Sequence, residues 1–364
     1  MLINEIINAK AIALQATRDA SNDIPYLGLQ WFPEAKKEGL DLKWIKTHEG
    51  LPVILKPSNF DAIPTLRARQ GLSTEKTQMA FFRESMQVTE EDEQEIARIR
   101  DAADPYFEAV YRNIYNDANT LLKAAQVVPE VMRMSLLTGQ NIVLSSDGVN
   151  YTYDYDPNGT WAATNFAELT DTDAWTDTTH STPLSDLNTA RKALAAKGIV
   201  ARYAPMNSTT FNNLVSNAQV VSAILAQNST ANIFPSDADI QAVIRNRTGL
   251  TIVIYDKMYK DYSGSDQNFY PDNYVTLLPE GKLGSTWFGT TPEERTARQV
   301  ADVDVAMYGV GIAVATKVEY GPPAKTLVTA SEIVLPSFEG MDSIYVINTS
   351  GSGSTGETGE TGTT

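Results

Sequence analysis

The 364-residue chain contains no cysteine and only two histidines, His48 and His180. Without thiols it can form neither a disulfide framework nor a thiolate nucleophile, which suits assembly in a reducing compartment. A histidine-based metal centre would need further ligands near these two residues. Both histidines lie in polar stretches, so we interpret them as solvated side chains and predict no metal site.

Sequence motifs of common enzymes are also missing. The chain has no Gly-x-Ser-x-Gly elbow and no phosphate loop ending in Gly-Lys-Ser or Gly-Lys-Thr. The acidic run TEED, Thr89–Asp92, fits a capped helix start better than a cation site. We therefore predict that the chain is not an enzyme and has no catalytic residues and no cofactor.

Long apolar runs and basic runs are equally scarce. No stretch approaches the roughly 18 apolar residues needed to span a membrane, and the N-terminus lacks the basic start and apolar core of a signal peptide. Lysine and arginine number 29 against 45 aspartate and glutamate, which gives a formal net charge of −16. Because nucleic-acid affinity comes largely from basic side chains that neutralise phosphates, nucleic-acid binding is a poor fit as the main function. Apolar residues make up 42% of the chain, which suffices for a sizeable core.

A long helix is the clearest element in the first half of the chain. Asp104 and Pro105 form a helix start, and apolar residues then recur with helical spacing. Pro129 perturbs the helix and Gly139 ends it, so we predict a helix from about 104 to 139, bent near Pro129. Its apolar face should pack on the sheet formed by residues 142–155 and 301–348, through Phe107, Tyr111, Ile114, Leu122 and Leu137.

A tight hairpin follows this helix. Asp147-Gly148 is a strong hairpin turn between strands at 142–144 and 149–155. The outer strand carries a tyrosine stripe on one face, formed by Tyr151, Tyr153 and Tyr155. The stripe could stack on sugars or bases, but packing against a helix or a neighbouring subunit is the commoner role of such tyrosines.

The second half of the chain shows two successive patterns. Residues 156–182 are polar and predict a loop, after which helices and strands alternate to about residue 299, as in an α/β subdomain. Within that section we predict a helix at 183–196, a helix capped by Ser208-Thr209-Thr210, and a polar loop at 256–267. From 301 to 348 only strands are indicated, rich in Val, Ile, Thr and Tyr. The tail has glycine at every third position, which indicates a flexible end.

Four motifs occur in an order typical of one protein family. They are LRARQGLS at 66–73, LLTG at 136–139, IYDKMYKDYSGSDQNFYPDN at 254–273, and SEIVLPSFEGMDSIYVI at 331–347. Each motif is weak by itself, but together they span the chain up to about residue 348. In this order they resemble the lambda-type E family of tailed-bacteriophage major capsid proteins.

This resemblance implies an α+β chain with the tailed-phage major capsid fold, which herpesvirus capsid floors and encapsulins share. It implies a structural protein that self-assembles into hexamers and pentamers of an icosahedral shell around packaged double-stranded DNA. The expected partners are further copies of the chain, a separate scaffolding protein, the portal and a possible decoration protein. No membrane contact and no sequence-specific DNA binding are expected. Assembly is expected in the host cytoplasm, and the product is the virion capsid.

The resemblance also divides the chain into parts. They are an N-terminal arm at 1–40, an extended β-hairpin loop at 41–86, a peripheral domain with the spine helix at 87–182 and 300–348, an axial domain at 183–299, and a flexible glycine-rich tail at 349–364. The long helix would be the spine. The hairpin after it would begin the peripheral-domain sheet, and the strands at 301–348 would close that sheet.

The extended loop carries the candidate interface residues. Its polar, proline-broken, two-stranded character cannot stabilise itself, so we expect it to project and to lie on neighbouring subunits. Arg67 and Arg69 occupy alternate positions, so both side chains face one way in an extended chain. They could bind phosphate, but carboxylates of a partner are the better match for so acidic a protein. We predict that Arg67, Arg69 and Lys76 contribute to the subunit interface; the alternative is that they are merely solvated.

Three other classes of function stay open on the sequence alone. An encapsulin-like compartment shell would have the same fold with a different cargo. A phage tail structural protein would be a tube-forming β-sandwich without the spine helix. An enzyme would need a concave site with perturbed titratable groups.

Overall fold

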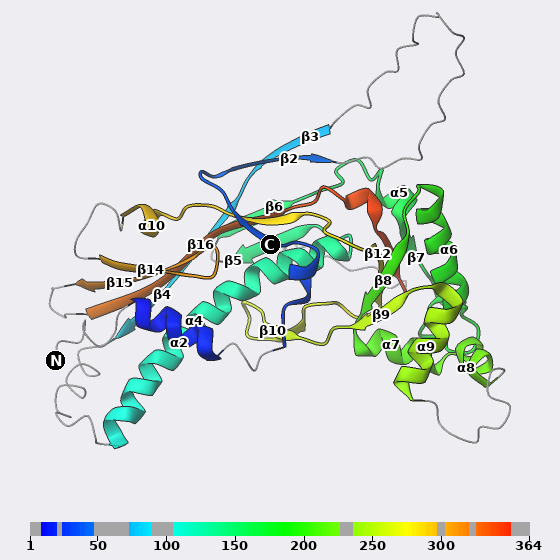
Figure 1. Ribbon diagram of the computed structural model, residues 1–364, viewed down its shortest axis with the longest axis horizontal. Helices are drawn as coiled ribbons and strands as arrows, with labels where there is room; N and C mark the ends of the chain where they lie inside the picture. The colour runs from blue at the N-terminus through cyan, green and yellow to red at the C-terminus, as the bar shows by residue number, and fades with distance from the viewer. Residues whose placement is uncertain are drawn as a thin grey trace, which may run out of the picture.

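The computed structural model describes residues 9–19, 24–46, 73–88, 105–146, 148–225, 236–296, 303–319 and 325–350. The body is elongated, and the long helix α4 (Pro105–Leu137) runs diagonally through it (Figure 1). A six-stranded sheet lies along one side of α4, and a five-stranded sheet with its own helices stands beyond the C-terminal end of the helix. The helix therefore joins the two halves of the fold.

Helix α4 confirms the predicted long helix. It contains 33 residues, and Pro129 lies inside it without ending it. Leu122 and Leu137 are buried, as their helical spacing predicts. The side chains of Phe107, Tyr111 and Ile114 lie outside the described residues. Gly139 follows the helix at a φ of 69°, a left-handed conformation that glycine adopts without strain.

The six-stranded sheet is organised around one long strand, β16 (Lys325–Ser337). Strand β4 (Ala80–Val88) pairs antiparallel along one edge of β16. The other edge pairs first with β15 (Ile312–Glu319) and then with β13 (Ser285–Phe288). The outermost members on that side are β14 (Val303–Tyr308), which pairs with β15, and β1 (Glu34–Lys36), which pairs parallel with β13.

The two faces of this sheet have different covers. Val328 and Ala330 of β16 pack with Leu122 of α4 and with Ile12 of α2 (Ala9–Asp19). The opposite face carries the short helix α10 (Pro292–Thr296), which β16 holds through a hydrogen bond from Ser331 Oγ to Glu293 Oε2 of 2.6 Å. Period-two alternation along β16 thus separates a helix-covered face from one that is partly open at Leu327 and Thr329 and buried from Ser331 onward.

The five-stranded sheet has strand order β7-β17-β12-β8-β9. These strands are β7 (Phe166–Glu168), β17 (Tyr345–Asn348), β12 (Tyr274–Pro279), β8 (Ala201–Met206) and β9 (Thr251–Ile254). Four helices accompany it: α6 (Pro183–Ala196), α7 (Ser208–Ser216), α8 (Ala218–Leu225) and α9 (Asp237–Thr248). Its separate core includes Trp175, Leu187, Leu194 and Val275. Helix α6 has the bounds that the sequence predicts, with Leu184, Leu187 and Leu194 buried.

Several local expectations in this half were wrong. Residues 156–182 are not a loop, since they contain α5 (Ala162–Asn165), β7 and the 3-10 helix η3 (Asp171–Asp173), and they bury Trp161 and Trp175. The cap of α7 is Asn207, whose side chain accepts a hydrogen bond from Thr210 N, and not the Ser-Thr-Thr run. The stretch 256–267 contributes to a hairpin of β10 (Met258–Lys260) and β11 (Asp266–Asn268).

The strand pairing also departs from the expected sheet closure. The hairpin β5 (Ile142–Ser146) and β6 (Val149–Tyr153) forms its own two-stranded sheet and does not begin the large one. Strand β17 belongs to the five-stranded sheet, whereas β13, from the expected α/β section, belongs to the six-stranded sheet. Period-two alternation shows which residues share a face, but it does not select the strand that pairs at long range.

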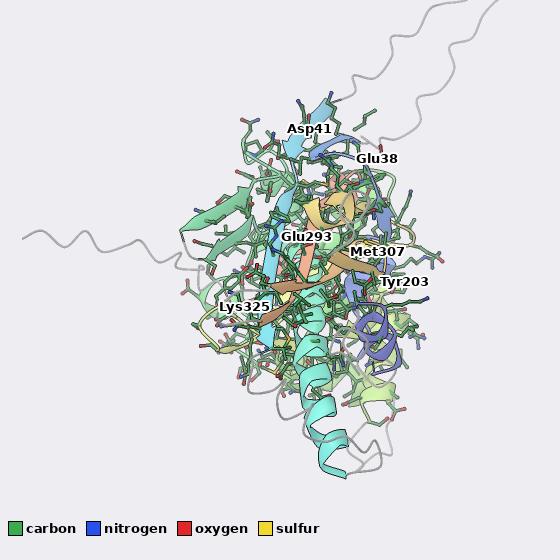
Figure 2. All side chains as sticks on the ribbon, turned by 90° about the vertical axis from the view of Figure 1, so that its left-hand side faces the viewer. Glu38, Asp41, Tyr203, Glu293, Met307 and Lys325 are labelled. Carbon is green, nitrogen blue, oxygen red and sulfur yellow. The ribbon has the colours of Figure 1, made fainter. Side chains whose placement is uncertain are left out.

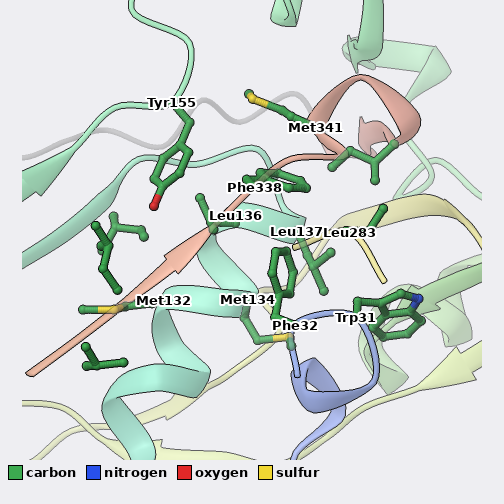
Figure 3. Close-up of a cluster of buried hydrophobic side chains, with 14 of the residues drawn as sticks. Trp31, Phe32, Met132, Met134, Leu136, Leu137, Tyr155, Leu283, Phe338 and Met341 are labelled. Atoms are coloured by element: carbon green, nitrogen blue, oxygen red, sulfur yellow. The ribbon is translucent and has the colours of Figure 1, made fainter. Parts of the chain in front are cut away.

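Residues from the N-terminal section are built into the centre of the body. Trp31 and Phe32 follow the 3-10 helix η2 (Leu27–Gln30) and are fully buried beside Met134, Leu137, Leu283 and Phe338 (Figure 3). Trp31 O accepts hydrogen bonds from the backbone N–H groups of Leu283 and Gly284. Strand β2 (Asp41–Lys46) then pairs with β3 (Ser73–Gln78), and its Leu42 and Trp44 are buried in the same core cluster.

Candidate functional site

The open face of the six-stranded sheet is the first candidate interaction surface. We call it the outer sheet face, and it consists of Arg83, Ser85, Gln87, Met307, Lys317, Leu327 and Thr329. Arg83, Ser85, Gln87 and Lys317 are exposed, and Leu327 and Thr329 are half-buried. Figure 2 views this end of the molecule, with Glu293 of α10, Met307 of β14 and Lys325 of β16 labelled. The face mixes charged side chains with small and apolar ones, as protein surfaces commonly do, so its candidacy rests on its position and its strand edges.

Charges on and around the outer sheet face are paired within the chain. Arg83 Nη2 lies 2.6 Å from Glu293 Oε1 of α10, and Lys36 Nζ lies 2.7 Å from Glu294 Oε2. Lys317 and Lys325 both reach Glu319, at 3.0 and 3.5 Å. Glu319 is half-buried, and its hydrogen bond with Lys317 lowers the pKa of its carboxyl. Exposed pairs of this kind contribute only about 0–1 kcal/mol, so they can exchange partners at an interface with little loss.

Two strands offer unpaired edges beside this face. Strand β4 has nine residues and pairs only with β16 among the described strands. Strand β14 pairs only with β15 within the described part of the chain. An open edge presents backbone N–H and C=O groups in a row, and another strand can add to it. The outer sheet face is thus bordered by backbone suited to pairing with another chain.

The strand pair β2–β3, at the base of the extended loop, carries one of the three predicted interface residues. Lys76 lies on β3, exposed, with Nζ 3.2 Å from Asp41 Oδ2 on β2. Arg67 and Arg69 lie outside the described residues. Nearby, Lys46 Nζ donates to Tyr155 O at 2.8 Å, which ties the β2–β3 pair to the body. Lys76 and Asp41 belong to the same chain, and both side chains are exposed. The Lys76 ammonium can therefore also bind a carboxylate of another subunit.

The tyrosine stripe packs against the chain itself, and its partners are three strands where a helix or another subunit was expected. The Tyr151 ring lies 5.8 Å from Phe82 of β4. Tyr153 donates its hydroxyl proton to Gln78 O at 3.0 Å, and Tyr155 donates to Pro336 O of β16 at 2.6 Å. Burial raises the pKa of Tyr153 to about 12, and the neighbouring Tyr151 adds to the shift. The three tyrosines therefore anchor the hairpin to β3, β4 and β16.

A buried polar cluster at the centre of the fold was not foreseen. We call it the Glu130 cluster, and it consists of Gly28, Glu34, Glu130, Arg133, Tyr255 and Thr286. Glu130 accepts hydrogen bonds from Gly28 N at 2.9 Å, from the Tyr255 hydroxyl at 3.0 Å and from Arg133 Nη1 at 3.2 Å. Burial raises the pKa of Tyr255, and its hydrogen bond to the Glu130 carboxylate raises it further. Glu130 is completely buried and Arg133 is 1% exposed.

Arg133 extends the cluster from α4 to two strands. Its Nε donates to Thr286 Oγ1 of β13 at 2.8 Å, and its Nη2 lies 3.3 Å from Glu34 Oε1 of β1. A Cβ atom added at Gly28 would lie 2.7 Å from Arg133 Cδ and from Glu130 Oε2, so only glycine fits there. The sequence does carry a signal for this site, because Glu130 and Arg133 are charges in an otherwise apolar helical stretch, VVPEVMRMSLL.

Among the described residues, the remaining titratable groups do not converge on a reactive site. His180 Nδ1 lies 2.8 Å from Asp177 Oδ2, in an exposed pair that lowers the pKa of Asp177. His48 lies outside the described residues. Within the described ranges, no group of three or more histidine or acidic side chains is placed to hold a metal ion. No helix among those ranges is both long enough and apolar enough to cross a membrane.

One family model matches most of the chain, and solved structures share its fold. Residues 14–313 match the family model described as phage major capsid protein E. A capsid protein of a prophage from Escherichia coli CFT073 has a similar structure, with a TM-score of 0.57 and 14% identity, covering 94% of this chain and 99% of that chain. A phage-related protein from Bordetella bronchiseptica RB50 has a TM-score of 0.54 and 14% identity, covering 95% and 98%. No curated protein matches the sequence. At these identities the two structures establish a shared fold.

Proposed function

The chain belongs to the phage major capsid protein E family, and on that premise we propose that its copies assemble into hexamers and pentamers of an icosahedral shell around packaged double-stranded DNA. The α+β fold is that of phage capsid proteins, and the protein is a structural component of the virion shell. The observation that carries the proposal is the family match across residues 14–313, which includes parts of both halves of the fold.

The outer sheet face is our candidate for a contact between subunits. It is partly open beside α10, it is bordered by edges of β4 and β14 that are unpaired among the described strands, and its charges are held by ion pairs that are exposed or half-buried. A flat face with two free edges suits repeated, reversible contacts, because backbone pairing and charge exchange give direction without a deep pocket. An assembling shell needs contacts that can form and reform before it closes.

We also propose that the extended loop contributes to the contact between subunits. We assign Lys76, together with Arg67 and Arg69, to contacts with acidic groups of an adjacent subunit. Support comes from the exposed position of Lys76 on β3 and from the net charge of −16, which supplies many carboxylates. In this proposal the pair β2–β3 is the root of the extended loop, fixed to the body by Leu42 and Trp44.

The parts of the chain receive roles on the same basis. The six-stranded sheet with α4 would form the peripheral domain, and the five-stranded sheet with α6 to α9 would form the axial domain around the symmetry axes. The separate hydrophobic core of the five-stranded half supports its treatment as a distinct body. Strand β17, from the section 300–348, belongs to the five-stranded sheet, and β13, from the section 183–299, belongs to the six-stranded sheet, so the division in space does not follow the division in sequence.

Partners other than the chain itself follow from the same reasoning. We propose a separate scaffolding protein, a portal and a possible decoration protein, with assembly in the host cytoplasm. The acidic balance supports a shell that encloses DNA without adhering to it, because a negative surface repels phosphates. None of these partners requires a catalytic residue or a cofactor in this chain.

Negative-stain microscopy of purified variants tests the role of the outer sheet face. Gln87→Trp places a bulky ring on this face at an exposed position opposite Leu327. Thr152→Trp is the matched control, since Thr152 is exposed on the outward side of the β5–β6 hairpin. We expect closed particles from the wild type and the control, and unassembled subunits from Gln87→Trp. Equal particle yield from all three would remove the outer sheet face from the proposal.

A further inference from the structure

One buried acid lies next to the Glu130 cluster without belonging to it. Glu332 lies on β16, opposite Phe82 of β4, and is 1% exposed. Neither of its carboxyl oxygens has a hydrogen-bond partner in the described structure. An ionised carboxylate is costly to bury without partners, so the stable form there is the neutral acid. Burial raises the pKa of Glu332 well above its ordinary value, and the charge of Glu34 raises it further against the opposing effect of Arg133.

The cation near Glu332 is already engaged. Arg133 donates to Glu130, to Thr286 and towards Glu34, at 3.2, 2.8 and 3.3 Å. The guanidinium could turn to Glu332 only by giving up some of these contacts. The contact with Glu34 is the most expendable, because it is long and the Glu34 side chain is 29% exposed, so water can replace it.

Among the described residues, the other charged groups around Glu332 are acids. Glu130 of α4 and Glu34 of β1 lie on the Arg133 side. On β4, Glu84 lies two residues from Phe82 on the same sheet face, but it is exposed. One arginine therefore faces three buried or half-buried carboxyl groups, and it cannot serve all of them at once if every one is ionised.

We propose that Glu332 is a proton-controlled latch for the segment from Gly28 to Lys36. With Glu332 protonated, Arg133 stays bound to Glu34 and Glu130 and holds this segment against α4. When Glu332 loses its proton to solvent, its carboxylate competes for Arg133, and β1 is released from the helix. The segment is a suitable switch element because it contacts α4 near both of its own ends. Gly28 N donates to Glu130, and Glu34 accepts from Arg133.

The direction of the pH dependence follows from the protonation states. The latched form binds a proton that the released form gives up. Opening is therefore favoured as the pH rises above the ordinary carboxyl range, and it levels off above the raised pKa of Glu332. In that window the opening equilibrium should increase about tenfold per pH unit, because one proton leaves with each opening.

Hydrogen–deuterium exchange of the full-length chain tests the latch directly. The reporter is the segment 28–37, where Phe32 N donates to Gly28 O at 2.9 Å and Lys37 N donates to Phe288 O at 2.8 Å. Helix α6, in the other core, is the internal reference. Glu332→Gln keeps the shape of the protonated acid and cannot ionise, and Glu84→Gln removes an exposed carboxyl from the same sheet face.

The latch predicts that protection of segment 28–37 falls in the wild type as the pH rises above the ordinary carboxyl range, towards the raised pKa of Glu332, with α6 unchanged. Glu84→Gln should behave as the wild type, and Glu332→Gln should lose the pH dependence after correction for intrinsic exchange. A flat wild-type profile overturns the proposal, whether or not Glu332→Gln folds. Equal loss of protection in α6 overturns it as well, since that result describes general unfolding. If Glu332→Gln shows the same pH dependence of exchange as the wild type, another group releases the proton, and the proposal is overturned.

Discussion

Glu130 and Arg133, one turn apart on α4 and both withdrawn from solvent, form an ion pair of 3.2 Å that joins the long helix to three other parts of the chain. Glu130 reaches back to Gly28 and across to Tyr255, and Arg133 reaches Glu34 and Thr286. The two side chains hold the N-terminal section and both sheets in register with the helix. The helix is thus fixed by polar contacts as well as by its apolar face.

Removing one member of this pair should be costly. Glu130→Ala leaves Arg133 buried with a missing carboxylate and leaves Gly28 N and the Tyr255 hydroxyl without their acceptor. We expect the free energy of unfolding to fall by about 3–5 kcal/mol, measured by urea denaturation. Glu84→Ala, at an exposed position on β4, is the control and should change it by less than about 0.5 kcal/mol. Similar losses in the two variants would mean that the cluster is not a centre of stability.

A methyl group at Gly28 should displace the same pair. Gly28→Ala places Cβ 2.7 Å from Arg133 Cδ and Glu130 Oε2, which is closer than packed atoms tolerate. We expect a loss of about 1–3 kcal/mol in the free energy of unfolding. Gly340→Ala is the comparison, because its nearest neighbours would lie at 3.3 Å. A Gly28→Ala variant as stable as Gly340→Ala would contradict the tight approach of this segment to α4.

Trp175 should be a main support of the five-stranded half. Its ring is fully buried, its Nε1 donates to Asp186 Oδ2 at 3.0 Å, and its backbone N donates to Thr349 O at 2.8 Å. Trp175→Ala should lower the free energy of unfolding by about 3–5 kcal/mol. Val200→Ala, at a position 64% exposed, should be nearly neutral. If residues 156–182 were a surface loop, the two substitutions would have equally small effects in thermal denaturation.

Arg67 and Arg69 of the extended loop are predicted to act between subunits. Replacing Arg67 and Arg69 with alanine should leave each subunit folded, as judged by circular dichroism, because neither residue is expected to support its own chain. Shell assembly should become slower or more sensitive to salt, because arginine–carboxylate contacts are screened by ions. Light scattering during assembly over a salt series measures this. If the assembly yield and its salt tolerance are unchanged in the double variant, the two arginines do not act between subunits. The extended loop would then act through its backbone and apolar contacts.

Much of the fold could be read from local patterns. The long helix, the Asp-Gly hairpin and α6 all follow from residue periodicity, helix starts and turn residues within a single stretch of sequence. The sheets could not be read in the same way. Strand β13 lies in the six-stranded sheet and β17 in the five-stranded sheet, the reverse of the expected division. Strand pairing depends on partners far along the chain, which local patterns do not reveal.

The candidate sites show the same limit. Thr and Asp in residues 156–182 suggested a loop, yet two tryptophans there are buried by distant segments. Glu130 and Arg133 stood out as charges in an apolar helix, but their partners Gly28, Tyr255 and Thr286 come from three remote regions. Glu332 gave no signal at all, since one acid in a strand usually faces water. The interface residues Arg67, Arg69 and Lys76 remain predictions.

The central claim is that this chain builds a closed shell, and electron cryomicroscopy of its purified assemblies tests it most directly. The account predicts closed icosahedral particles with pentamers at the fivefold vertices and hexamers between them. Each subunit should show the six-stranded sheet along α4 and the five-stranded half towards the capsomer axis. Monomers alone, open tubes or particles without fivefold vertices, obtained under conditions where the subunit is folded, would contradict it.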